Sequence, residues 1–310
     1  MTRAIFSLLI LFFTSVLPAS SQVRTHATSD RVVQVQMRNV RYHFAQGVEV
    51  SIRQLRGELV PTAQLPVFDD KNSFTLHISS AEISITSASL ANVLNSHVLN
   101  ARTAPIKDIS VRIEKGHLKV KGKLHSKGDI PFETDGTLSV TSDGKLRLHA
   151  EKIKAFKLPI KGLMDLLGIE ISDLIKSGKA RGLQPEGDDL ILDPEQILPP
   201  PHIEGKVIAV RLEGNNIVQV FGGERREPLL VDVPNYMAYR GNQLRFGKLT
   251  MSDTDMILID LNPNDPFDFS LELYQKMLTA GYTKVTASFG LRVYMRDINK
   301  LSQASPGQRP

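Results

Sequence analysis

The chain has no cysteine and no tryptophan, and only 6% of its residues are aromatic. The absence of cysteine excludes disulfides, thiolate metal sites, cysteine nucleophiles and lipid attachment at a lipobox. The absence of tryptophan and the scarcity of other rings argue against a surface that stacks nucleic-acid bases. With 310 residues, the chain is long enough to fold by burying apolar surface alone.

The first residues predict an export signal. Arg3 supplies a positive charge, residues 4–17 are apolar, and small residues precede Gln22 at the spacing that a signal peptidase prefers. The apolar run is short for a membrane span, which needs about 20 residues. We therefore expect a cleaved signal peptide over residues 1–21, a disordered segment over 22–30, and a periplasmic or secreted location. An uncleaved anchor is the alternative.

The charge is unevenly distributed. Residues 101–181 hold 17 Lys or Arg and 10 Asp or Glu, whereas residues 182–310 hold 13 and 17. A basic face suits anionic lipid head groups, and export argues against nucleic acid as the partner. We expect peripheral contact with an anionic membrane surface through lysines of the middle region, although a solvated strand face is the simpler alternative for each. These residues are Lys119, Lys121, Lys123, Lys152, Lys154 and Lys157.

The middle of the chain changes its hydrophobic period. Between Ile106 and Leu148 the apolar residues alternate with polar ones, which is typical of strands with one apolar face. Turn pairs such as Lys115–Gly116 fit tight hairpins. Residues 161–177 then place leucines and isoleucines at helical spacing. A one-sided sheet must cover its apolar face, so we expect this amphipathic helix to cover it.

The flanking regions predict further elements. Alternating strands begin at Arg31, and Ser87 or Ser89 can cap a helix with the sequence SLANVLNSHVLNA. A polar break precedes residue 228. We expect a lipid-binding-like sheet domain over 31–227, a strand–helix–strand segment over 228–300 whose helix Asp268 caps, and a disordered tail over 301–310.

The motifs for catalysis and metal binding are weak, and we expect no enzyme, no cofactor and no metal. The G-x-S-x-G, H-E-x-x-H and P-loop patterns are missing from the sequence. Asp260, Asn262 and Asn264 fit the first positions of a calcium loop, but Leu271 stands where a bidentate Glu belongs, so a turn is favoured. Scattered acids such as Asp253 leave a hydrolase as a remote alternative, and three histidines of the middle strands leave a metal site as another.

Residues 80–221 resemble a known family. The order of segments is the helix SLANVLNSHVLN, the strands IKDISVRIEKGHLKVKGKL and VTSDGKLRLHAEKI, the helix LPIKGLMDLL…DLIKSG and a closing strand pair. This order is similar to that of LmeA-like phospholipid-binding proteins of bacterial envelopes. The resemblance implies a TULIP-like fold with a lipid channel lined by apolar residues, here Leu90, Leu94, Val111, Val120, Leu148, Leu163, Leu167, Ile171 and Leu174.

Pattern and resemblance together predict an α+β fold, in which an elongated curled antiparallel sheet wraps a long amphipathic helix and a C-terminal α/β segment is added. The expected function is that of an exported, non-enzymatic protein that binds phospholipid or another acyl-chain lipid in an aliphatic groove, for envelope lipid transport or sensing. The alternative is an envelope scaffold or protein-interaction module with a closed core and no ligand.

Overall fold

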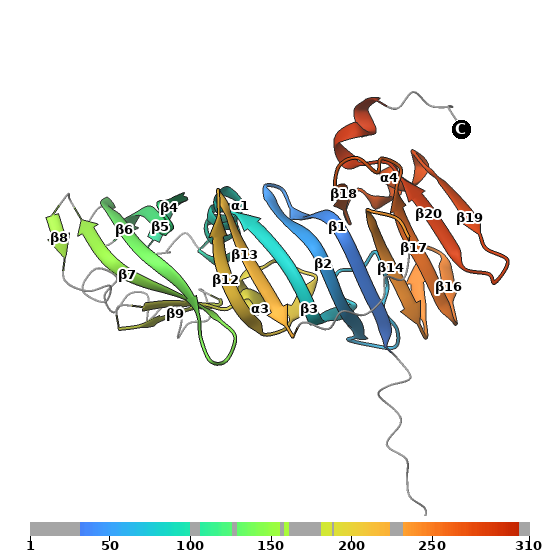
Figure 1. Ribbon diagram of the computed structural model, residues 1–310, viewed down its shortest axis with the longest axis horizontal. Coiled ribbons are helices and arrows are strands. Elements are labelled where there is room, and N and C mark those ends of the chain that lie inside the picture. Colours follow the sequence, from blue (N-terminus) through green and yellow to red (C-terminus); the bar gives the residue numbers. More distant parts are fainter. Residues whose placement is uncertain are drawn as a thin grey trace, which may run out of the picture.

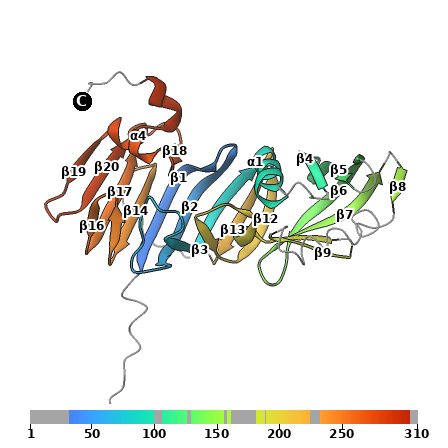
Figure 2. The ribbon, with the colours of Figure 1, turned by 180° about the vertical axis from the view of Figure 1, so that it is seen from behind.

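The protein is an elongated, mostly β body in which two large sheets lie end to end (Figures 1 and 2). The structure is a computed structural model, and it describes residues 32–99, 106–125, 129–155, 158–160, 181–187, 189–223 and 232–303. The expected signal peptide, the segment 22–30, the helix over 161–177 and most of the expected tail lie outside the described residues.

The larger sheet has 11 strands. Its long centre is the antiparallel meander β1 (Val33–Ala45), β2 (Val48–Pro61) and β3 (Phe74–Thr86). The strands on the two sides of this meander are β11 (His202–Glu204), β12 (Val207–Glu213), β13 (Asn216–Gly222), β14 (Tyr236–Gly241), β17 (Thr254–Asp260), β18 (Phe267–Ser270), β19 (Tyr282–Val285) and β20 (Leu291–Met295). Because β14 pairs with β1, the C-terminal strands continue the sheet that the N-terminal strands begin.

The smaller sheet has 7 strands, and it contains the alternating region that the sequence analysis identified. Its strands are β4 (Ile106–Glu114), β5 (His117–His125), β6 (Asp129–Val140), β7 (Leu146–Ala155), β8 (Leu158–Ile160), β9 (Leu183–Glu186) and β10 (Asp189–Leu192). Lys115 and Gly116 both have positive φ angles, 53° and 78°, which confirms the tight turn expected between β4 and β5. β15 (Leu244–Phe246) and β16 (Leu249–Met251) form a separate two-stranded sheet.

The two large sheets meet where the turn between β6 and β7 reaches β12. The backbone N–H of Val207 donates to the carbonyl of Gly144 at 3.2 Å. A Cβ at Gly144, whose φ is +89°, would lie 2.8 Å from the side chain of Lys206, so this close approach requires glycine. The junction therefore brings the apolar faces of the two sheets into one interior.

Short helices cover part of this interior. α1 (Ser87–Val93) continues into the π-helical segment η2 (Leu94–Val98), which confirms the helix expected after β3. Its cap is Thr86, whose hydroxyl accepts from the N–H of Ser89 at 3.0 Å, and neither expected serine serves as the cap. The other helices are α3 (Pro194–Ile197), α4 (Tyr274–Thr279) and η3 (Ile298–Gln303). Within the described ranges, no helix is both long enough and apolar enough to cross a membrane.

The prediction of an α+β fold with a sheet wrapped around a long amphipathic helix is wrong. Among the described residues, the longest helical stretch is α1 with η2, which have 7 and 5 residues, and the fold is mostly β. Among the described residues, β6 contacts β12 where the two sheets meet, and α1 packs against β2, β3 and β4. The pattern showed that each apolar face needs a cover, but it could not show that the short helix α1 packs against strands of both sheets.

The expected C-terminal helix with Asp268 as its cap is also only partly correct. Residues 267–270 form strand β18, which runs parallel to β1, and the helix α4 begins later, at Tyr274. The rings of Phe267 and Phe269 are fully buried, and Phe269 contacts Tyr42 with ring centroids 5.6 Å apart. Two apolar residues in a four-residue strand are too few to reveal a period of two.

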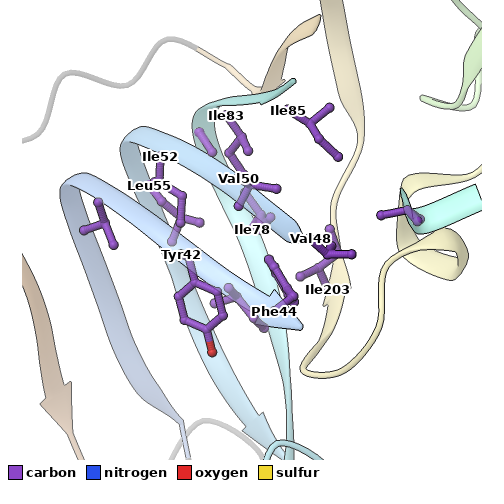
Figure 3. Packing of buried hydrophobic residues seen from close by; sticks show 14 of the residues in the cluster. Tyr42, Phe44, Val48, Val50, Ile52, Leu55, Ile78, Ile83, Ile85 and Ile203 are labelled. Carbon is purple, nitrogen blue, oxygen red and sulfur yellow. The ribbon is translucent and has the colours of Figure 1, made fainter. Parts of the chain in front are cut away.

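The core lies on the inner face of the β1–β3 meander (Figure 3). Tyr42 and Phe44 of β1, Val50 and Ile52 of β2, and Ile83 of β3 are all buried. Their alternation with exposed residues follows from the pleat, which turns successive side chains to opposite faces. Each such side chain contributes about 1.5–3 kcal/mol when it is fully buried.

Candidate functional site: an apolar channel

Three adjoining cavities lie along the interior. The small-sheet cavity lies between α1 and strands β4–β10, the middle cavity lies where the two sheets meet, and the large-sheet cavity lies under β1, β2 and β14. Their cavity volumes are about 70, 60 and 40 Å³ respectively. Each is smaller than the about 300–1,000 Å³ that is usual for small-molecule sites, so a bound molecule must push the lining side chains apart.

The cavities adjoin one another, because neighbouring cavities share wall residues. Leu90, Leu118 and Leu192 line both the small-sheet and the middle cavity. The middle and large-sheet cavities share four residues in turn, Phe44, Ile52, Leu76 and Ile203. Figure 3 shows Phe44 beside Ile203, with Ile52 further along β2 in the same cluster. We call the three cavities together the apolar channel.

The sequence analysis identified one end of this channel. Five of the nine residues predicted to contact lipid lie within the described chain, and all five line the small-sheet cavity: Leu90, Leu94, Val111, Val120 and Leu148. They come from α1, η2, β4, β5 and β7, so the fold gathers residues from five elements around one space. The other four, Leu163, Leu167, Ile171 and Leu174, lie outside the described residues.

The sequence analysis did not predict the middle cavity or the large-sheet cavity. Their walls come mainly from β1, β2, β3, β13 and the connection between α3 and β11, with Ile83, Ile203 and Phe221 as examples. The sequence feature that could have pointed to these cavities is the alternation of apolar and polar residues in 33–60 and 74–86. This alternation predicted strands, but it gave no reason to place a binding site on them. The channel therefore extends much further along the molecule than the resemblance implied.

The channel is neutral. Among the described residues that line it, none is charged, and the polar ones are Thr134, Gln219, Tyr42 and Tyr239. Burial raises the pKa of both tyrosine hydroxyls above the ordinary value, so both stay protonated. The Oγ1 of Thr134 and the Oε1 of Gln219 are buried and have no hydrogen-bond partner among the described residues. Such a wall can hold hydrocarbon, and it offers no countercharge to an ion.

The lysines predicted to face a membrane lie on the outer face of the smaller sheet, but acidic residues neutralise them. Lys119 lies 2.6 Å from Glu114, Lys121 lies 2.9 Å from Glu133, and Lys123 lies 2.7 Å from Asp108. The pKa of Lys119 is raised, mainly by its hydrogen bond to Glu114, so this lysine stays charged.

Two further lysines of this set lie on β7. Lys152 and Lys154 are exposed, and their Cα partners on β6 are Asp135 and Glu133. Lys157 lies outside the described residues. Positive and negative side chains therefore lie side by side on this outer face. Each of the five described lysines of the set has an acidic residue as its ion-pair or cross-strand partner.

A cluster of three aspartates lies next to the end of strand β17 in the larger sheet. Carboxylate oxygens of Asp260, Asp265 and Asp297 lie within 4.8 Å of one another. The Nζ of Lys300 lies 3.1 Å from Asp265 and 3.0 Å from Asp297, so an internal cation balances part of the charge. Desolvation by burial, with the neighbouring carboxylates, raises the pKa of Asp260 to about 7.

The expected turn at the calcium-like motif is present in this cluster. Asp260 accepts a hydrogen bond from the backbone N–H of Asn262 at 2.8 Å, and Asn262 accepts one from the N–H of Asn264 at 3.3 Å. The Nδ2 of Asn235 donates to Asp260 at 3.1 Å. These hydrogen bonds hold the loop that follows β17 in place.

No protein-family model matches the chain, and no curated protein matches it either.

Proposed function

We propose that this protein binds an acyl-chain lipid in the apolar channel and that it acts by carrying or sensing that lipid rather than by catalysis. The observation that carries the proposal is the row of three adjoining cavities, whose described walls are mostly aliphatic or aromatic and contain no charged residue. A neutral, apolar interior suits a hydrocarbon chain, because the chain needs contact area and no hydrogen bonds.

The proposal includes a location outside the cytoplasm and a phospholipid as the ligand. The apolar N-terminal segment supports a periplasmic or secreted location, and the resemblance of residues 80–221 to LmeA-like proteins supports phospholipid as the source of the acyl chain. An exported lipid carrier must collect its cargo from a membrane, so we propose that the lysine-bearing outer face of the smaller sheet contacts anionic lipid. Because acidic residues neutralise these lysines, such contact should be weak and sensitive to salt.

The first test is native mass spectrometry of the full protein purified from the cells that make it, with lipid extraction from the same sample. An excess mass that matches one extracted lipid would support the proposal and would identify the lipid class. A mass without ligand that persists after incubation with phosphatidylglycerol vesicles would overturn it. That result would favour a protein-interaction scaffold with a closed core.

A matched pair of variants tests where the lipid binds. Ala150 lines the small-sheet cavity, whereas Ala209 lies exposed on β12. The substitution Ala150→Phe fills the cavity with a ring and should abolish uptake of a fluorescent fatty acid by the delipidated protein. Ala209→Phe adds the same ring outside the channel and should leave uptake unchanged. Equal uptake by both variants would exclude the small-sheet cavity as the site.

Vesicle sedimentation tests the membrane contact separately. We expect the protein to sediment with phosphatidylglycerol vesicles at low salt, and not with phosphatidylcholine vesicles or at high salt. The substitution Glu133→Gln removes the carboxylate 2.9 Å from Lys121 and should strengthen this binding. Binding that ignores both salt and lipid charge would overturn the proposed role of the lysines, and it would leave lipid binding in the channel unaffected.

A further inference from the structure

The hairpin between β19 and β20 ends in an apolar tip. Val285 and Phe289, at this end of the hairpin, are 68% and 90% exposed, and they are the two most exposed large apolar residues that the structure describes. β19 is the last strand of the larger sheet, at the end of the elongated body that lies farthest from the smaller sheet (Figures 1 and 2). One exposed apolar residue is ordinary, but two at the same turn form a surface that needs a reason.

The turn holds Phe289 in a strained conformation. Its φ is +62°, in the left-handed region that a bulky residue rarely adopts. Thr286 closes the turn: its N–H donates to the carbonyl of Gly290 at 2.8 Å, and its carbonyl accepts from the N–H of Phe289 at 3.0 Å. The hydroxyl of Thr286 also accepts from the N–H of Gly290, at 2.8 Å. The ring gains no burial in return for this strain, and strain that packing does not explain is typical of functional positions.

The residues behind the tip suit the boundary between water and lipid. The rings of Tyr282 and Tyr294 stack with centroids 4.5 Å apart, and the Nζ of Lys284 lies 5.2 and 5.6 Å from the two centroids. Tyr282 precedes Val285 by three residues, which is about 10 Å along a strand. Tyrosine is enriched at the head-group level of membranes, and interfacial elements bury their apolar side chains about 5–10 Å deep. This spacing places the tyrosines at head-group level when the tip reaches the acyl chains.

The basic residues of this region favour an anionic surface. Residues 273–296 contain four Lys or Arg and no Asp or Glu. Asp255 of β17 balances Arg292, at 2.9 Å, whereas Lys284 is exposed. An exposed cation beside an apolar tip is attracted to anionic lipid head groups.

We propose that Val285 and Phe289 insert into an anionic bilayer, so that the hairpin of β19 and β20 docks this end of the protein on a membrane. Two side chains are far too few for a protein partner, which needs about 800 Å² on each side. A bilayer needs no matching shape, because its lipids rearrange around an inserted ring. This contact lies at the opposite end of the body from the lysine-bearing face of the smaller sheet, and it requires no lipid in the channel.

Tryptophan fluorescence tests the insertion directly, because the chain has no tryptophan of its own. Phe289→Trp places a single reporter at the tip. The vesicles contain phosphatidylglycerol and a dibromo-phosphatidylcholine whose bromine atoms lie among the acyl chains. We expect the emission to shift to shorter wavelength and to be quenched by the bromine. The matched control is Ile208→Trp, at a 53% exposed residue of β12 on the opposite edge of the same sheet, and its emission should stay unchanged.

Removing the ring should weaken docking without harming the fold. We expect Phe289→Asn, which suits the positive φ, to bind phosphatidylglycerol vesicles about tenfold more weakly in a sedimentation assay. Phe289→Leu keeps an apolar side chain and should retain most of the binding, and Ile208→Asn should bind as the original protein does. Uptake of a fluorescent fatty acid by delipidated Phe289→Asn should equal that of the original protein, which separates docking from binding in the channel.

Three results would overturn this inference. In the first, the Phe289→Trp protein does not sediment with the vesicles, or it sediments without being quenched. In the second, Phe289→Asn binds the vesicles as tightly as the original protein. In the third, the emission of Phe289→Trp is already shifted without vesicles and depends on protein concentration, because a second copy of the chain covers the tip. None of these results concerns uptake of an acyl chain by the channel, so the proposed function stands or fails separately.

Discussion

Leu90 of helix α1 and Leu118 of strand β5 both line the small-sheet cavity and the middle cavity, so the two side chains lie at the boundary between these cavities. Both leucines are buried, at 7% and 2% exposure. A chain that occupies both cavities must therefore pass these two side chains.

A larger side chain at this boundary should shorten the acyl chain that the protein can hold. The substitution Leu118→Phe places a larger ring at the junction, and overpacking of this kind costs about 1–3 kcal/mol. We expect the affinity for an eighteen-carbon fatty acid to fall about tenfold, while a ten-carbon fatty acid that fits one cavity binds as before. Displacement of a fluorescent probe measures both affinities.

The control for that experiment is Leu249→Phe, at a leucine on β16 that is 48% exposed. It should leave both affinities unchanged. If Leu118→Phe weakened the short and the long chain by the same factor, the two cavities would not be successive parts of one channel.

A partly buried group of polar side chains connects strands β1 and β18. The Nε2 of His43 lies 2.7 Å from Oδ1 of Asp268, and Arg41 lies 3.8 Å from the same oxygen. The substitution Asp268→Ala leaves both basic side chains without this acceptor. We expect a loss of about 2–3 kcal/mol in the free energy of unfolding, measured by urea denaturation, because hydrogen bonds to charged groups are among the stronger ones.

An exposed pair in the same sheet region provides the comparison. Lys71 lies 3.4 Å from Glu272, whose side chain is 62% exposed. Exposed pairs of this kind contribute about 0–1 kcal/mol, so Glu272→Ala should change stability little. If Asp268→Ala and Glu272→Ala lowered the free energy of unfolding equally, burial of Asp268 would add nothing to the strength of its contacts with His43 and Arg41.

The sequence predicted those parts of the fold that depend on near neighbours. Alternation placed Val111, Val120 and Leu148 on one face, and the structure brings them to one cavity. The pairing of β1 with β14 joins residues that are about two hundred positions apart, and no local period can specify such a partner. The cover of each sheet depends on these distant pairings, so the helix-centred fold was a reasonable but wrong inference.

One polar residue of the channel wall was also visible in the sequence. Thr134 shares the parity of Phe132 on strand β6, so alternation alone places its side chain on the apolar face. It was overlooked because threonine is common in strands on either face. Only the three-dimensional structure shows that its Oγ1 is buried and lacks a hydrogen-bond partner among the described residues.

Asp260 should make the stability of the protein depend on pH. Its pKa is about 7 in the folded chain and near the ordinary value of 3.8 in the unfolded chain. Between these values the folded state holds more protons, so stability falls as the pH rises from about 4 to about 7. A shift of this size corresponds to at most about 4 kcal/mol.

The substitution Asp260→Asn should remove this dependence. Urea denaturation at pH 4.5 and pH 7.5 should show a smaller difference between the two conditions than in the original protein. Asp253→Asn, at an exposed aspartate just before the other end of β17, should keep the original difference. An unchanged pH dependence in the Asp260 variant would show that other groups cause it.

Phe289 is an unfavourable residue at its position, and replacing it should stabilise the protein. Its φ is +62°, a left-handed conformation that is strained for a bulky side chain, and its ring is 90% exposed in the turn between β19 and β20. Asparagine adopts this conformation more readily, and the exposed ring gives up almost no packing when it is removed. We expect Phe289→Asn to raise the free energy of unfolding by about 0.5–1 kcal/mol.

The comparison is Val285→Asn at the neighbouring exposed strand residue, whose side chain is 68% exposed. Valine is favoured in strands and asparagine is not, so this variant should be slightly less stable than the original protein. If Phe289→Asn raises the free energy of unfolding and Val285→Asn lowers it, the gain at Phe289 comes from relief of backbone strain. A loss of stability in Phe289→Asn would instead mean that the ring makes a stabilising contact that outweighs the strain.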